Sequence, residues 1–161
     1  MSSAPGNQDT TEQLREKIKS KMDVAKFFAG FITVFLGVAF RDLSNLAADS
    51  NRLVSFSGQA GMLFILGALA FSVSTMFAYD RLMMPPALWR VPPSNDDLFH
   101  QMVRAWQRLF VPAVATFVIG LLGFIIAVTK HLLPSVVLWI VPIIAAFLCY
   151  RDFSKRQGFI D

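Results

Sequence analysis

The fold class follows from residues 109–129, LFVPAVATFVIGLLGFIIAVT, a run that contains no Asp, Glu, Lys or Arg. The hydrocarbon core of a bilayer is about 30 Å thick and is crossed by roughly 20 apolar residues in an α-helix. Lipid offers no water to free backbone N–H and C=O groups, so such a segment must be a helix, which satisfies these groups internally. We therefore predict a transmembrane helix here.

Three more charge-free runs occur, at 27–40, 53–79 and 132–150, in a sequence that is 55% hydrophobic and only 16% charged. Soluble proteins have roughly 25% charged residues. The run 27–40 is short, and it spans a bilayer only if Lys26 and Arg41 extend their side chains to the two interfaces. The sequence thus predicts an all-α integral membrane protein with four transmembrane helices in two hairpins, at about 24–42, 53–79, 106–129 and 132–150.

The basic residues are distributed unequally over the connections. Of the 15 Lys and Arg residues, only Arg41, Arg52 and Lys130 fall in the two connections on one side. Connections rich in Lys and Arg remain in the cytoplasm, so we expect both termini and the middle connection to be cytoplasmic, in a plasma membrane or bacterial inner membrane. The basic residues lie beside apolar segments and not on one face with stacking aromatics, which favours anionic lipid headgroups over nucleic acid as a partner.

The remaining segments complete the predicted organisation. Residues 1–9 are small and polar, which predicts a disordered tail. Residues 10–26 have apolar side chains at helical spacing, and we expect a cytoplasmic amphipathic helix that runs into the first span. The transmembrane domain then covers 27–150, and 151–161 is a cytoplasmic tail.

The middle connection, 83–93, carries two Pro-Pro pairs around a tryptophan, so it cannot be helical throughout. We interpret it as an interfacial loop, with a docking strip for a partner as the alternative. Ser94 and Asp97 then predict a capped helix start. An apolar stripe follows at Leu98, Met102, Ala105 and Leu109. The candidate interfacial anchors in this region are Trp89, Arg90, Trp106 and Arg108.

Small residues recur at about four-residue spacing in the predicted spans. Such residues allow helix backbones to approach closely, which is how helices associate in lipid. Whether the contacts lie within one chain or between copies is open at this stage. The candidate helix-packing residues are Ala29, Thr33, Gly37, Ser57, Gly61, Thr116, Gly120 and Gly123.

Polar side chains within the spans are few, and Gln59 is the most polar of them. A buried amide needs a partner on a neighbouring helix or water in a cavity. We expect a hydrogen bond between helices, with a polar cavity or pore formed by Gln59, Ser57 and Ser74 as the alternative.

No catalytic or metal-binding motif stands out, and no cofactor is implied. Asp96, Asp97 and His100 lie within one turn of a helix, but they lack a nucleophile and further metal ligands. A single cysteine, Cys149, excludes an internal disulfide.

Three functions are open at this stage. The leading hypothesis is a small non-enzymatic membrane protein that self-associates or joins other membrane proteins, with permeation through an oligomer as one output. The alternative is a protein that binds or transports lipids or small uncharged molecules. A membrane enzyme that uses Asp96, Asp97, His100 or Arg104 is the third.

Overall fold

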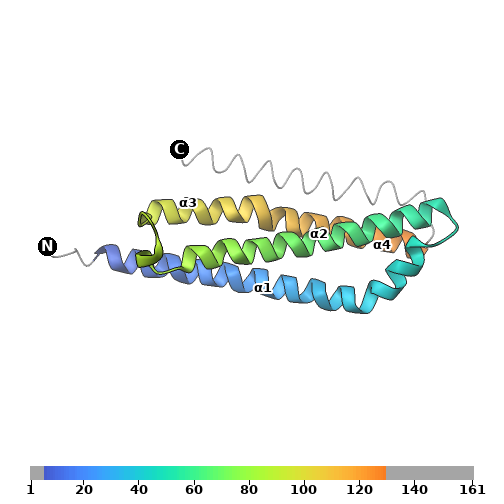
Figure 1. The fold of residues 1–161 in the computed structure, drawn as a ribbon, viewed down its shortest axis with the longest axis horizontal. Coiled ribbons are helices and arrows are strands. Elements are labelled where there is room, and N and C mark those ends of the chain that lie inside the picture. The colour runs from blue at the N-terminus through green and yellow to red at the C-terminus, as the bar shows by residue number, and fades with distance from the viewer. Residues whose placement is uncertain (1–5, 130–161) are drawn as a thin grey trace.

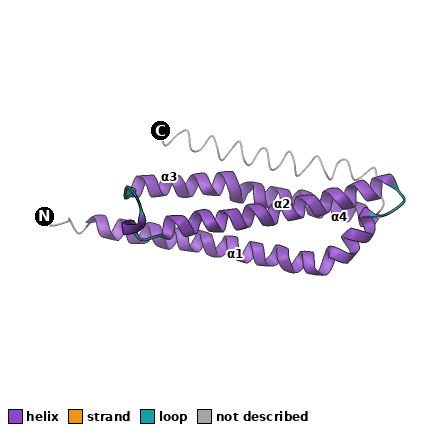
Figure 2. Cartoon of the chain, in the orientation of Figure 1, coloured by secondary structure: helices purple, strands orange, loops and turns teal. Residues whose placement is uncertain are grey.

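The computed structural model describes residues 6–129, which form an elongated bundle of three long helices (Figure 1). Helix α1 comprises Gly6–Ala47 and helix α2 comprises Arg52–Met83. The third long helix consists of α3 (Asn95–Ala105), a π-helical turn η2 (Trp106–Phe110) and α4 (Val111–Thr129). A 3₁₀ turn, η1 (Pro86–Leu88), lies in the connection before α3, and loops occur only at the two ends of the bundle (Figure 2).

The all-α class is confirmed, but the predicted number of spans is wrong. The described residues contain three helices that are long and apolar enough to cross a membrane, and these indicate a membrane protein. The sequence-based count used charge-free length alone, which does not test whether a segment packs into the bundle. The predicted last span, 132–150, and the tail, 151–161, lie outside the described residues. The two-hairpin arrangement depended on that fourth crossing.

The predicted amphipathic segment, 10–26, and the first span, 24–42, are parts of one helix of 42 residues. The helix also includes residues 6–9, which the sequence analysis assigned to a disordered tail. At the opposite end α1 bends toward α2 (Figure 1).

The buried positions of α1 and α2 follow a repeat of 3.5 residues. Steps of four and three alternate along each helix, which is the pattern of left-handed coiled-coil packing. Helix α2 packs against both α1 and α4, and so it is the central helix. In α1 the repeat runs through the buried positions Ala25, Ala29, Ile32, Leu36, Ala39 and Leu43. In α2 it runs through Gly58, Gly61, Ile65, Ala68, Ser72, Thr75, Tyr79 and Leu82. Leu14, Ile18, Val54 and Ser57 are also buried, nearer the ends of the two helices.

The π-helical turn η2 shifts this repeat by one residue in the third long helix. After Ala105 the next buried position is Phe110, a step of five instead of four, and the predicted stripe residue Leu109 is only partly buried. Pro112 explains the turn, because proline has no N–H to donate and its ring clashes with the carbonyl four residues earlier. The Val111 N–H instead bonds the Trp106 carbonyl, five residues back.

Phenylalanine rings fill the space between α1 and α4, whose backbones make few contacts with each other. Phe117 lies edge-on to three rings of α1, with centroid distances of 5.5 Å to Phe28, 5.8 Å to Phe31 and 5.9 Å to Phe35. Phe35 also meets Phe124 at 6.1 Å. Each such pair contributes about 0.5–1.5 kcal/mol beyond its buried area, so the rings hold the outer helices together.

Local hydrogen bonds define both ends of the bundle. At one end, the predicted capping box of α3 is confirmed, since the Ser94 hydroxyl accepts from the Asp97 N–H while the Asp97 side chain accepts from the Ser94 N–H. The Thr11 hydroxyl joins α1 to this end by donating to Asn95 Oδ1 at 2.8 Å. At the other end, the Ser55 hydroxyl donates to the carbonyl of Ala47, the last residue of α1.

Candidate functional site

Three of the predicted helix-packing glycines meet where α2 contacts α4. A Cβ atom added to Gly61 would lie 3.1 Å from the Gly120 carbonyl oxygen and 3.4 Å from the Gly123 carbonyl carbon. A Cβ atom on Gly120 would lie 2.9 Å from the Ile65 backbone nitrogen. Only glycine lets these two backbones approach so closely. These contacts lie within one chain.

The other small candidates are not brought together. Ala29 is buried in the bundle, whereas Thr33 and Gly37 are exposed on the outside of α1. A Cβ atom on Gly37 would meet nothing within 4 Å. Ser57 is buried in α2, and the Thr116 hydroxyl donates to the Pro112 carbonyl of its own helix at 2.7 Å.

The polar candidates do not converge on one cavity. Gln59 is exposed near the end of the bundle, where its side-chain amide donates to Ser55 Oγ at 3.2 Å and, between helices, to the Ala47 carbonyl of α1 at 3.4 Å. Ser74 lies roughly 22 Å further along α2 and donates to its own helix, at the Ala70 carbonyl. Two serine hydroxyls of α2 bond α1: that of Ser55 donates to the Ala47 carbonyl, and that of the buried Ser72 donates to the Ala25 carbonyl at 3.0 Å.

Ser72 was not among the polar residues singled out from the sequence, because a serine in a helix more often bonds a carbonyl of its own helix. Its place in the 3.5-residue repeat of α2, seven residues after Ile65 and seven before Tyr79, was the available signal.

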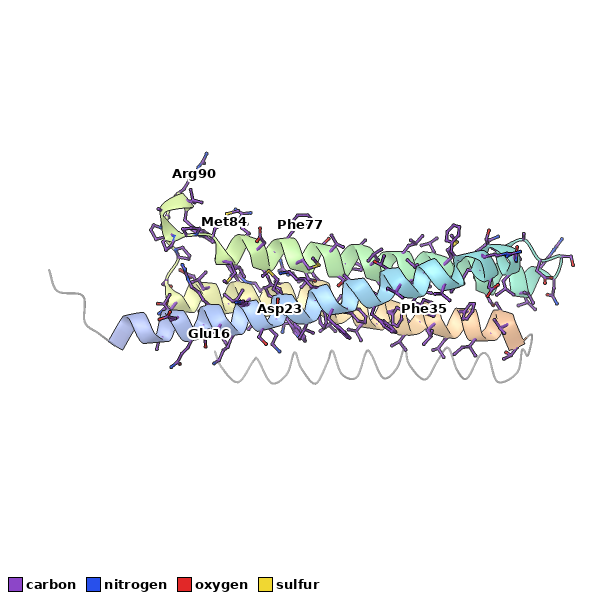
Figure 3. The ribbon with its side chains drawn as sticks, turned by 90° about the horizontal axis from the view of Figure 1, so that it is seen from below. Glu16, Asp23, Phe35, Phe77, Met84 and Arg90 are labelled. Carbon is purple, nitrogen blue, oxygen red and sulfur yellow. The ribbon has the colours of Figure 1, made fainter. Side chains whose placement is uncertain are left out.

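The predicted interfacial anchors lie at one end of the bundle but differ in their contacts. Trp89 packs on the apolar core at this end, and its indole N–H donates to the Met84 carbonyl at 3.3 Å. Arg90 is exposed and projects away from the helices (Figure 3). Arg108 is also exposed, whereas Trp106 is partly buried and stacks on Phe110 with 4.2 Å between ring centroids.

A cavity of about 360 Å³ opens beside Trp106. The three long helices all contribute to its wall, and the ammonium nitrogen of Lys21 lies 4.5 Å from the centroid of the Trp106 ring. This distance is that of a cation–π contact, which orients the lysine over the ring. The lining residues are Lys21 from α1, Tyr79 from α2, Met102 and Val103 from α3, and Trp106 from η2.

Tyr79 is the unusual member of this wall. Its side chain is fully buried, yet its hydroxyl has no hydrogen-bond partner among residues 6–129. Most buried hydroxyls have a partner, because an unpaired one loses its bonds to water without replacement. The cavity therefore combines a cation, an unpaired hydroxyl and apolar surface, a set suited to hold an anionic group joined to an apolar one.

The group considered for acid–base chemistry has a structural role. The Asp97 carboxylate accepts from both the hydroxyl and the N–H of Ser94, and these bonds lower the pKa of Asp97 at the capped, exposed start of α3. Asp96 and His100 are exposed on the same helix. Within residues 6–129, no three His, Cys, Asp or Glu side chains are grouped so that they could hold a metal ion.

Comparison with known proteins does not add a function. No known protein family, curated protein or solved structure gives a significant match to this chain.

Proposed function

We propose that this protein is a non-enzymatic membrane subunit that self-associates through the outer face of α1. The observation that carries the proposal is the pair Gly30 and Gly37. A Cβ atom on either glycine would meet nothing within 4 Å in the part of the chain that the structure describes, so neither glycine is needed for packing among those residues. Glycine in a helix costs about 1 kcal/mol relative to alanine, and close approach of a second helix would offset that cost.

The side chains around these glycines support a helix partner. Gly30 and Gly37 are seven residues apart, which places them on one face two turns apart. The large apolar side chains beside them are strongly exposed, at 78% for Phe27, 68% for Val34 and 78% for Val38. A second copy of α1 could place such side chains into the gaps above the glycines. We therefore commit to a second copy of this chain as the partner.

We further propose a plasma membrane or bacterial inner membrane as the location. Among the described residues, most Lys and Arg side chains lie at the bundle end that holds Lys21 and Arg90, whereas Arg41 and Arg52 lie toward the other end. Under the positive-inside rule the first end is cytoplasmic. Anionic lipid headgroups would then surround the basic side chains at that end.

The test of self-association is the number of subunits per particle. Single-molecule photobleaching in lipid vesicles at low protein density should show two or more bleaching steps for the wild type. Gly30→Leu combined with Gly37→Leu should shift the distribution to one step, because leucine side chains would hold two α1 helices apart.

Gly67→Leu is the matched control. Gly67 is on α2, and a Cβ atom there also meets nothing within 4 Å, so the change adds equal bulk in an apolar helix away from α1. It should leave the bleaching steps unchanged. A wild type that is a single copy in vesicles would overturn the proposal, and so would a double variant that assembles as the wild type does.

A further inference from the structure

The cavity beside Trp106 has the chemistry of a binding site for an anionic phospholipid. We propose that it binds the phosphate of such a lipid, with the Lys21 ammonium and the Tyr79 hydroxyl as the two polar contacts. This site is separate from the outer face of α1, and the inference does not depend on self-association.

The unpaired hydroxyl of Tyr79 favours a ligand in this cavity. Tyr79 is fully buried, lines the cavity, and has no partner for its hydroxyl among the described residues. A phosphate oxygen is a strong acceptor, and a hydrogen bond from a neutral donor to a charged acceptor is about twice as strong as one between neutral groups. The hydroxyl therefore gains most from an anionic ligand.

The charge of the cavity wall favours an anionic ligand. Lys21 is the one cation among the five lining residues, and no acidic side chain is among them. The nearby Asp23 pairs with Lys26, at 3.8 Å, and so its carboxylate is directed to the next turn of α1. The Trp106 ring holds the Lys21 ammonium at the cavity by its face and leaves N–H groups free for an anion.

The position of Lys21 along α1 also matches the depth of lipid phosphates. Lys21 lies five residues before Lys26, which corresponds to about 7 Å along a helix, and the charge-free run begins directly after Lys26. Lys21 therefore lies on the headgroup side of the apolar run. A diffusing lipid presents its phosphate at this depth.

The remaining lining residues fit the rest of a lipid. Met102, Val103 and the Trp106 ring are apolar and can contact the glycerol backbone and the first acyl carbons. A volume of about 360 Å³ is within the range of small-ligand pockets and accommodates a phosphate group with its glycerol. A free phosphate ion would leave this apolar surface uncovered, so the wall favours the lipid.

The experiment is native mass spectrometry of the purified full chain in detergent with an equimolar mixture of phosphatidylglycerol and phosphatidylcholine. The wild type should retain phosphatidylglycerol in preference to phosphatidylcholine. Tyr79→Phe removes only the hydroxyl and should reduce retention about tenfold, the effect of one hydrogen bond to a charged group. Lys21→Met should abolish the preference between the two lipids.

Two controls separate binding from stability and from total charge. Without lipid, Tyr79→Phe should unfold at the same or a higher temperature than the wild type, because its buried hydroxyl has no partner to lose. Lys19→Met removes an exposed charge from the same helix without touching the cavity and should retain the preference.

Three results would overturn the proposal. One is equal retention of the two lipids by the wild type. The second is unchanged retention in Tyr79→Phe, which would make the hydroxyl a passive core group. The third is that millimolar inorganic phosphate displaces bound phosphatidylglycerol as effectively as added phosphatidylglycerol does. This result would assign the site to a free anion.

Discussion

Replacing Gly120 by alanine tests the close contact between α2 and α4. The new Cβ atom would lie 2.6 Å from Ile65 Cγ1, 2.9 Å from the Ile65 nitrogen and 3.0 Å from the Gly61 carbonyl oxygen. Non-bonded carbon atoms are best separated by about 3.5–4.0 Å. The Ile65 side chain can rotate away, but the two backbone atoms move only if the helices separate.

We expect Gly120→Ala to lower the free energy of unfolding by about 1–3 kcal/mol, the usual cost of overpacking. The matched control is Gly67→Ala, where the added methyl group meets nothing within 4 Å. This change should raise stability by up to about 1 kcal/mol, because alanine favours the helix. Reversible unfolding in mixed micelles, followed by circular dichroism, measures both. If Gly120→Ala were as stable as Gly67→Ala, the backbones would not be in the contact described.

Three further changes test other parts of the structure. Ser55→Ala removes the hydroxyl that bonds the last carbonyl of α1 and should cost about 0.5–1.5 kcal/mol in the same unfolding assay, whereas no loss would mean that water replaces it. Pro112→Ala should allow a regular α-helix in place of the π-turn and rotate the preceding segment by one residue. The contacts of that segment would then be lost, and the unfolding temperature should fall. An unchanged Lys21–Trp106 distance in a solved structure of the variant would show that the proline does not cause the π-turn. With Cys149 replaced, Ser50→Cys should react with an impermeant thiol reagent added outside intact cells while Ala87→Cys stays protected, and the reverse result would invert the proposed orientation.

Part of the candidate site was accessible from the sequence. Trp106 was predicted as an interfacial anchor, because tryptophan beside basic residues at the start of an apolar run is typical of a membrane boundary. Lys21 belongs to the segment 10–26, which was predicted as a cytoplasmic amphipathic helix, but it was not singled out as an anchor. That these two side chains meet, and that Tyr79 lies beside them, was not predicted.

The contact among Lys21, Tyr79 and Trp106 could not be predicted because it depends on how each of the three long helices is rotated about its own axis. Tyr79 faces inward because the 3.5-residue repeat of α2 places it there. Trp106 reaches Lys21 across a π-turn that shifts the third long helix by one residue relative to a regular α-helix. A sequence pattern gives the apolar face of one helix, but the rotation of each helix relative to its neighbours is set by packing.

The sequence by itself determined the helical class, the apolar segments that indicate a membrane protein and the capped start of α3, because each depends on local composition and on the absence of water in lipid. It predicted four transmembrane helices from charge-free length alone, whereas the described residues contain three helices long and apolar enough to cross a membrane. Only the tertiary structure decided which glycines serve the α2–α4 contact, which serines bond a neighbouring helix and which buried hydroxyl lacks a partner among the described residues. Those properties belong to pairs of surfaces far apart in the chain, and a contact between two surfaces is defined only when both are folded and in register.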